Sequence, residues 1–150
     1  MSFTTLDDVI KFAVKREESA FQLYQSAAKK ATSISSRKMF EELAHEEAAH
    51  KVSFERLDLG VLENHTFSKE VDMKLAEYMV DIPFREDMTY AEILHYAMKT
   101  EEYAYKLYTT AAENTPDLKV KKMLLLLADV EKGHKQRIED IYDERVLTEG

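Results

Sequence analysis

The 150-residue chain contains no cysteine, only three glycines and only two prolines. Without cysteine it can form no disulfide, thiolate zinc site, thiolate iron centre or cysteine nucleophile. Any metal must therefore be held by nitrogen and oxygen ligands. These glycines and prolines are too few to form the turns of a many-stranded sheet, whereas 45% hydrophobic and 33% charged residues suit amphipathic helices. The composition predicts an all-α fold.

Acidic residues exceed basic ones by 29 to 21, which gives a formal net charge of -8. This balance argues against nucleic acid or an anionic membrane as the main partner. The first residues lack a basic segment followed by an apolar one, and the longest strongly apolar run, residues 123–128, is too short to span a bilayer. We therefore expect one cytoplasmic domain over residues 1–150.

Two helices are predicted in each half of the chain. Thr5 begins a helical pattern that continues to about residue 31, and a turn at residues 32–36 begins a second one that stops at Gly60. A capping box at residues 89–92 opens a third helix, which continues to about residue 114. Thr115 as N-cap and Pro116 at the first helical position then begin the fourth.

The predicted connection between the second and third helices spans about residues 60–88. Val71, Leu75, Tyr78 and Ile82 indicate one short amphipathic helix within it, ended by Pro83. A connection this long can travel the length of a bundle, whereas the other two turns are short. The predicted topology is therefore a four-helix bundle of two antiparallel hairpins, with the long crossover letting the second and third helices run parallel.

The two hairpins are repeats of one another. A shift of 84 residues aligns nine residues of the first predicted helix with identical residues of the third, without a gap. The same shift carries Glu47 and His50 of the second helix onto Glu131 and His134 of the fourth. Whatever one half builds in the core, the other half should build opposite it.

Each predicted helix carries polar residues within its apolar stripe. The fourth helix, for example, places Leu127, Glu131, His134 and Ile138 at spacings of three and four. The inward polar residues of the four helices are Glu17, Glu47, His50, Glu101, Glu131 and His134.

Four carboxylates facing one another in a dry core would be strongly unfavourable without compensation. Two divalent cations would supply it, and no other compensation is evident in the pattern. One Glu from each of two helices with Glu-x-x-His from each of the other two is the di-iron or di-manganese pattern of ferritin-like bundles. The alternative is a metal-free polar core. Without metal, raised carboxylate pKa values should make the protein relatively more stable as the pH is lowered.

Residues near the six are given supporting or unrelated roles. Tyr24 and Tyr108 either donate hydrogen bonds to metal-bound carboxylates or are core tyrosines bonded elsewhere. Gly133 is expected to allow close packing beside the site. The remaining neighbours are predicted to be solvated or structural: Glu18, Glu46, Glu102, His45, His65 and His95.

These motifs resemble the rubrerythrin branch of the ferritin-like superfamily over essentially all four helices. The resemblance rests on Glu17 with Ala20 and Tyr24, Glu47 with His50, Glu101 with Ala104 and Tyr108, and Glu131 with His134. It implies two iron ions, with Glu17 and Glu101 as terminal ligands, Glu47 and Glu131 as bridges, and His50 and His134 each binding one ion. It also implies reaction with hydrogen peroxide or dioxygen, with no catalytic residue beyond the ligands.

Two features depart from the rubrerythrin pattern. Rubrerythrins commonly carry a cysteine-bound iron domain that delivers electrons, and this cysteine-free chain lacks one, so a separate donor protein is expected. Typical members also have another carboxylate three residues after the third-helix glutamate, where this chain has Ala104, and the repeat mate Ala20 is no substitute.

The predicted function is a di-iron oxidoreductase that reduces peroxide or dioxygen with an external electron donor. The alternatives are a ferroxidase or iron-sequestering protein, and a di-manganese catalase-like protein, because the same ligands accept manganese. The leucine-rich run at residues 123–127 covers more than one helix face, so part of it must pack against the crossover or another subunit. We predict a homodimer.

Overall fold

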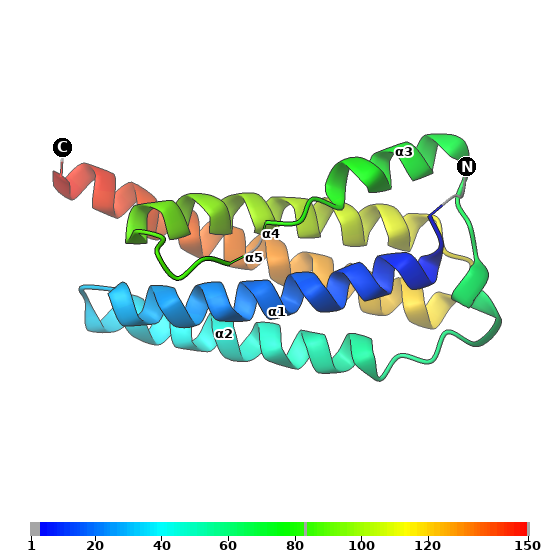
Figure 1. The fold of residues 1–150 in the computed structure, drawn as a ribbon, viewed down its shortest axis with the longest axis horizontal. Coiled ribbons are helices and arrows are strands. Elements are labelled where there is room, and N and C mark those ends of the chain that lie inside the picture. Colours follow the sequence, from blue (N-terminus) through cyan, green and yellow to red (C-terminus); the bar gives the residue numbers. More distant parts are fainter. Residues whose placement is uncertain (1–3, 83, 150) are drawn as a thin grey trace.

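The computed structural model describes residues 4–82 and 84–149, and within these ranges it is all-helical with no strand. Four long helices form the bundle, and two short ones lie in the crossover (Figure 1). In chain order they are α1 (Leu6–Lys30), α2 (Ile34–Glu55), the 3-10 helix η1 (Gly60–Asn64), α3 (Lys69–Tyr78), α4 (Tyr90–Glu113) and α5 (Leu118–Glu149).

The topology confirms the sequence prediction. Helices α1 and α2 form one antiparallel hairpin, and α4 and α5 form the other (Figure 1). The connection from η1 through α3 returns along the bundle, so that α4 starts at the same end as α2 and runs parallel to it. This arrangement places each helix of one hairpin beside the matching helix of the other hairpin, α1 beside α4 and α2 beside α5.

Capping boxes begin both α1, at the predicted helix start Thr5, and α4, at the predicted capping box of residues 89–92. The Thr5 side chain accepts a hydrogen bond from the Asp8 amide at 3.1 Å, and the Asp8 carboxylate accepts one from the Thr5 amide at 2.9 Å. Thr89 and Glu92 make the same reciprocal pair at 3.2 and 3.0 Å. Both exchanges satisfy amide groups that the first helical turn leaves unpaired.

The predicted end of the second helix at Gly60 is wrong, because α2 ends at Glu55. The Asp58 carboxylate accepts a hydrogen bond from the Gly60 amide at 3.0 Å, and this local turn competes with helical pairing. Gly60 has a positive φ of 55°, a conformation that suits glycine, and it begins η1 instead. In the crossover, α3 ends at Tyr78, so Ile82 lies beyond the helix, and Pro83 lies outside the described residues.

The start of the fourth helix also differs from the prediction. Asp117, not Thr115, provides the cap, since its carboxylate accepts a hydrogen bond from the Val120 amide at 3.0 Å. Thr115 is buried and its hydroxyl has no hydrogen-bond partner within the described part of the chain. An anionic cap also interacts favourably with the positive end of the helix dipole, which favours Asp117.

The apolar core divides into two clusters along the bundle. The α3-end core contains Leu6, Val9, Phe54, Leu75, Leu107, Tyr108 and Leu124 among its buried residues. The turn-end core, nearer the α1–α2 turn, contains Leu23, Tyr24, Phe40, Leu43, Ile93, Leu94 and Ile138. On α1, Ala13 belongs to the first cluster and Ala20 to the second. The stretch between them is where α1 turns Glu17 inward.

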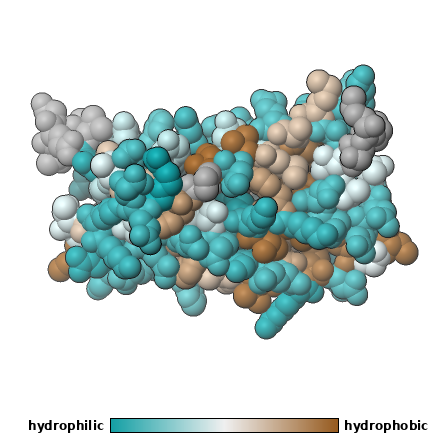
Figure 2. Space-filling model, viewed as in Figure 1, coloured by the Kyte–Doolittle hydropathy of each residue, from teal (hydrophilic) through white to brown (hydrophobic). Residues whose placement is uncertain are grey.

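Hydrophilic side chains cover most of the face shown in Figure 2. In the leucine-rich run of α5, Leu124 and Leu127 are buried, but Leu125 and Leu126 are 40% and 65% exposed. The described crossover therefore does not cover both of them, and the homodimer stays a prediction. None of the described helices is long and apolar enough to cross a membrane.

The two candidate caps of α5 can be separated by mutation. Asp117→Ala is expected to destabilise the protein by about 1 kcal/mol, because it removes the cap, and to lower the melting temperature by about 2–4 °C. Thr115→Val should have little effect or a stabilising one, because it removes an unpaired buried hydroxyl. Thermal unfolding followed by circular dichroism measures both. A larger loss for Thr115→Val than for Asp117→Ala would contradict the assignment.

Candidate metal centre

The structure brings all six predicted ligand residues together in the middle of the bundle. They form two groups, and within each group one possible ligand atom per residue lies within 4.8 Å of all the others. The groups are Glu17, Glu47, His50 and Glu131, and Glu47, Glu101, Glu131 and His134. Glu47 and Glu131 belong to both groups, as residues that bridge two metal ions would.

The four carboxylates are fully shielded from solvent. Glu17, Glu47, Glu101 and Glu131 are each 0% exposed, and His134 is 2% exposed. Burying an ionised carboxylate costs several kcal/mol unless it is paired or coordinated. The cluster therefore requires positive charge close to it.

Both histidines turn the same ring nitrogen toward the carboxylates. His50 Nδ1 lies 3.1 Å from Glu131 Oε1 and 3.4 Å from Glu47 Oε1, and His134 Nδ1 lies 3.2 Å from Glu47 Oε1. Their rings stack nearly parallel, with centroids 6.2 Å apart. One imidazole nitrogen is thus available to each of the two groups.

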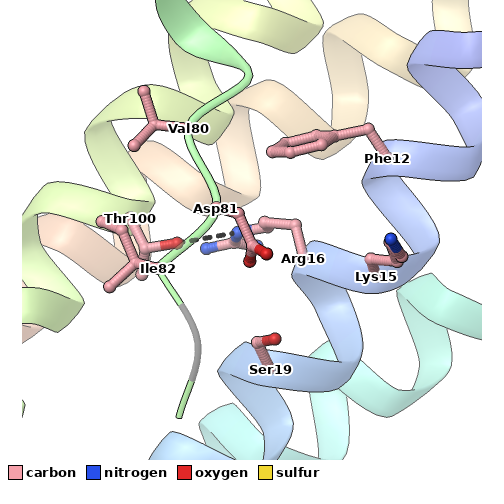
Figure 3. A pocket seen from close by; sticks show the side chains of 8 residues that line it. All are labelled: Phe12, Lys15, Arg16, Ser19, Val80, Asp81, Ile82 and Thr100. Atoms are coloured by element: carbon pink, nitrogen blue, oxygen red, sulfur yellow. Dashed lines mark hydrogen bonds between the residues drawn. The ribbon is translucent and has the colours of Figure 1, made fainter.

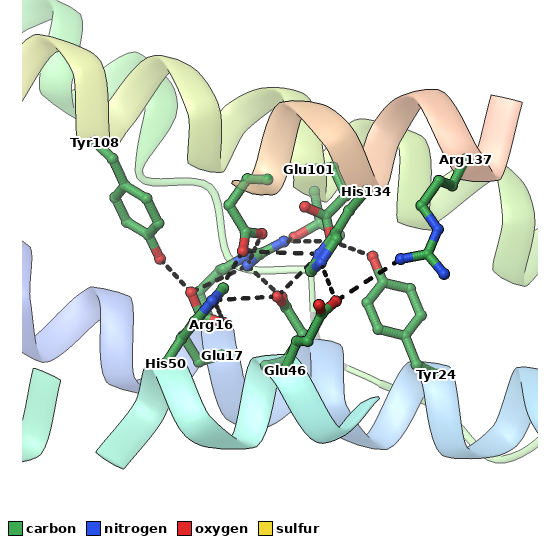
Figure 4. A network of polar contacts seen from close by, with 12 residues as sticks. Arg16, Glu17, Tyr24, Glu46, His50, Glu101, Tyr108, His134 and Arg137 are labelled. Atoms are coloured by element: carbon green, nitrogen blue, oxygen red, sulfur yellow. Dashed lines mark hydrogen bonds and ion pairs between the residues drawn. The ribbon is translucent and has the colours of Figure 1, made fainter. Parts of the chain in front are cut away.

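Glu46 holds the His134 ring from outside. Its carboxylate lies 2.7 Å from His134 Nε2, on the side away from the cluster (Figure 4). Sequence analysis placed Glu46 on the surface, and its side chain is indeed 44% exposed. The contact was missed because the repeat offers no counterpart: Val130 stands at the matching position. A proton on Nε2 shared with Glu46 leaves Nδ1 free to bind a metal.

Tyr24 and Tyr108 both donate hydrogen bonds to carboxylates of the cluster, and their role beside bound metal stays a prediction. The Tyr108 hydroxyl donates to Glu17 Oε1 at 2.8 Å, and the Tyr24 hydroxyl donates to Glu101 Oε1 (Figure 4). Each tyrosine of one hairpin therefore bonds the glutamate of the other. Each also belongs to a different apolar core, so the two hydroxyls approach the carboxylates from opposite ends of the site.

Arg16 is a buried part of the site that sequence analysis missed. Its Nη1 lies 2.6 Å from Glu47 Oε2 and 3.3 Å from Glu17 Oε1, and Nη1 also forms an ion pair with Glu131 Oε2. Its Nη2 lies 3.0 Å from Glu101 Oε1. One guanidinium thus touches all four carboxylates and provides a compensation that was not evident in the sequence pattern.

A signal for Arg16 was present in the helical spacing. Arg16 follows Ala13 by three residues and precedes Ala20 by four, which places it on the inward face of α1. The 84-residue shift instead pairs it with Thr100, so the repeat did not draw attention to it. In the structure these two residues meet: Arg16 Nε donates to Thr100 Oγ1 at 3.4 Å.

The carboxyl groups divide into two pairs by the direction of their pKa shifts. Burial raises the pKa of Glu17 to about 7 and that of Glu131 well above its usual range, against the opposing effect of Arg16. Burial acts in the same direction on Glu47 and Glu101, but the Arg16 guanidinium and hydrogen bonds outweigh it and lower both pKa values. The expectation that all four would be raised is therefore wrong for these two.

The histidine pKa values are raised despite burial. Burial alone would lower them, but hydrogen bonds and charge attraction from Glu17 and Glu47 raise the pKa of His50 to about 9. Glu101 and Glu47 raise that of His134 to about 10. Without metal at neutral pH, two imidazolium ions and Arg16 therefore share the compensation of the carboxylates.

The other sequence expectations can now be placed. Glu18 and Glu102 are partly exposed and pair with Lys51 at 2.9 Å and Lys106 at 3.6 Å. His45 and His95 are exposed. His65 Nε2 lies 3.1 Å from the Asn114 carbonyl oxygen, and His65 belongs to neither ligand group. The interpretation of Gly133 is wrong: a Cβ there would meet nothing within 4 Å, so close packing does not require glycine.

The donor set fits a pair of transition-metal ions. Two buried carboxylate oxygens, Glu17 Oε2 and Glu101 Oε2, have no hydrogen-bond partner in the described part of the chain. Carboxylate oxygens with one imidazole nitrogen per ion suit iron and manganese. Such orphaned acceptors are costly unless a cation completes them.

A comparison with known families decides the relationship. The rubrerythrin family model matches residues 8–83 and 92–150. The chain belongs to the rubrerythrin family. No curated relative matches the chain.

Solved structures agree with this family in fold. One is from Thermotoga maritima and is described as a ferritin-like diiron-carboxylate protein; its TM-score is 0.72 at 19% identity, over 97% of this chain and 99% of that one. Another, a hypothetical protein from Pyrococcus furiosus, has a TM-score of 0.68 at 22% identity, over 93% of this chain and 89% of that one. At these identities the likeness supports the ferritin-like fold of this rubrerythrin-family chain.

Metal-free protein is expected to lose stability as the pH rises from about 6 to about 10. The folded-state pKa values of Glu17, His50 and His134 are raised to about 7, 9 and 10, so the folded protein binds more protons than the unfolded chain in this range. The melting temperature should fall by about 10 °C across it. Below about pH 4.5, protonation of Glu47 and Glu101, whose pKa values are lowered, should also reduce stability.

Thermal melts of metal-free and metal-loaded protein over this pH range make the measurement. Bound metal keeps its ligands deprotonated, so the loaded protein should lose less stability at high pH. A metal-free melting temperature that stays constant or rises from pH 6 to 10 would rule out protonated histidines in the cluster.

Proposed function

We propose that the protein is a non-haem di-iron oxidoreductase that reduces hydrogen peroxide or dioxygen with electrons from a separate donor protein. The observation that carries the proposal is that Glu47 and Glu131 belong to both candidate ligand groups. Membership of the rubrerythrin family supports iron as the metal and peroxide or dioxygen as the oxidant.

The chain would hold the two ions with three kinds of ligand. Glu17 and His50 would bind one ion, Glu101 and His134 would bind the other, and Glu47 and Glu131 would be shared. When bound, two iron ions would supply the two electrons that reduce one peroxide to two water molecules, with two protons taken up. The 150 residues contain no cysteine, so no cysteine-bound iron centre within them can return electrons to the two oxidised iron ions.

The surrounding residues would fix the ligands and keep the site dry. Tyr108 and Tyr24 hold the carboxylates of Glu17 and Glu101 by their hydroxyl groups. Glu46 orients the ring of His134. The two apolar cores close the site along the bundle, which strengthens the hydrogen bonds and charge interactions inside it.

One observation favours a second candidate, oxidation of ferrous iron followed by its retention. Ala104 is 2% exposed and lies in the α3-end core, at the position where typical rubrerythrins carry a further carboxylate. Without that oxygen ligand, less charge is donated to the ferric pair, and peroxide turnover should be weaker than in typical members. The same donors accept manganese, so metal analysis of protein from its native host distinguishes the catalase-like alternative.

The ligand assignment can be tested by comparing Glu131→Ala with Glu102→Ala. Parent protein loaded anaerobically with Fe²⁺ is expected to hold about two ions per chain and to consume peroxide repeatedly when an artificial donor is present. Glu131→Ala removes a bridge, so it should hold at most about one ion and lose most turnover. Glu102→Ala, which changes a partly exposed acid paired with Lys106, should do neither.

Elemental analysis and peroxide consumption read out both variants. Two ions per chain in Glu131→Ala would show that α5 does not supply a bridge. Full iron loading with a single oxidation and no repeated turnover would favour the ferroxidase candidate over the oxidoreductase. Absence of bound metal in the parent would exclude both.

A further inference from the structure

Arg16 occupies the side of the centre that faces α1 and α4. The two shared glutamates divide their oxygens between it and the histidines: Glu47 turns Oε2 to Arg16 and Oε1 to His50 and His134. Glu131 likewise turns Oε2 to Arg16 and Oε1 to His50. A bridging carboxylate must use both oxygens, so the guanidinium competes directly with metal for one oxygen of each bridge.

The charge balance sets the direction of this competition. In metal-free protein, Arg16 is a permanent positive charge that touches all four carboxylates. Two divalent cations would neutralise the four carboxylates by themselves, so a guanidinium that stayed among them would be a buried positive charge without a counter-ion, which is strongly unfavourable. Arg16 and two metal ions are therefore alternative ways of satisfying the same oxygens.

The structure contains a place for the displaced side chain. A cavity of about 90 Å³ lies directly beside Arg16, between α1, α4 and the last part of the crossover (Figure 3). Asp81 and Thr100 line it. The Thr100 hydroxyl already accepts a hydrogen bond from Arg16 Nε. Among the described residues, Asp81 is exposed and forms no ion pair with Arg16. Asp81, which has no ion pair with another described residue, thus lines the same cavity as the long, flexible side chain of Arg16.

We propose that Arg16 is a displaceable internal cation, which metal ions drive out of the carboxylate cluster and into the cavity beside Asp81. The proposal rests on the metal binding of the proposed function and adds a reversible step to it. In the metal-free state Arg16 keeps the carboxylates compensated and the bundle closed. In the loaded state Asp81 compensates Arg16, so the protein exchanges metal without unfolding.

Three variants separate the steps, with Zn²⁺ alone as the probe and binding followed by calorimetry. Arg16→Met removes the competing cation, so it should bind Zn²⁺ at least about tenfold more tightly while the metal-free melting temperature falls by about 10 °C. Asp81→Asn removes the receiving charge, so it should weaken Zn²⁺ binding about threefold and leave metal-free melting unchanged. Lys15→Met, a matched loss of an exposed neighbouring cation, should alter neither.

A measurement on the unmutated protein does not depend on the folding of a variant. With arginine labelled by ¹⁵N, the Nε–H resonance of Arg16 is identified by its loss in Arg16→Lys. Saturation with Zn²⁺ should move this resonance, because the guanidinium that contains Nε leaves the four carboxylates that its Nη atoms now contact. A resonance that stays in place in fully loaded protein would overturn the proposal.

The outcomes distinguish this proposal from the one on which it rests. Equal and tight Zn²⁺ binding by parent, Arg16→Met and Lys15→Met would overturn displacement but leave the metal centre intact. Absence of binding by both parent and Arg16→Met would overturn the proposed function, and the displacement of Arg16 with it.

Discussion

Four glutamates lie fully buried at one level of the bundle, and the arrangement around them follows from the need for positive charge at that place. Each carboxylate would destabilise the fold by several kcal/mol if left uncompensated. In the metal-free chain, positive charge comes from Arg16 and from His50 and His134, whose pKa values are raised. The hydroxyl groups of Tyr24 and Tyr108 add hydrogen bonds to the carboxylates. The same oxygens and imidazole nitrogens form two overlapping ligand groups. Stability without metal and affinity for metal are therefore opposing demands on one cluster.

The duplicated hairpins explain why the cluster forms in the middle of the molecule. Antiparallel pairs joined by a full-length crossover bring α1 against α4 and place matching helices of the two repeats across the centre (Figure 1). The crossed tyrosine bonds, from Tyr108 to Glu17 and from Tyr24 to Glu101, follow from this pseudo-twofold arrangement. The departures from symmetry at Arg16 and Glu46 give the two halves different surroundings.

Features that depend on periodicity were predictable from the sequence. Inward stripes at spacings of three and four identify Glu47, His50, Glu131 and His134, and the repeat places them opposite one another. Features that break the repeat were not. The 84-residue shift aligns Arg16 with Thr100 and Glu46 with Val130, so neither residue has a counterpart in the other repeat. A comparison of the two repeats therefore did not identify Arg16 or Glu46 as part of the site. Asp58 and Asp117 were missed because short turns and caps depend on single side-chain hydrogen bonds, which periodicity does not report.

The most direct test of the account is a crystal structure of protein loaded anaerobically with Fe²⁺, with anomalous difference maps recorded above and below the iron absorption edge. We expect two iron peaks about 3.5–4 Å apart, both beside Glu47 and Glu131 and each next to one histidine Nδ1. A fully loaded crystal with no peak among the six residues, or with iron only on the acidic surface of α2, would contradict the assignment of a two-metal centre.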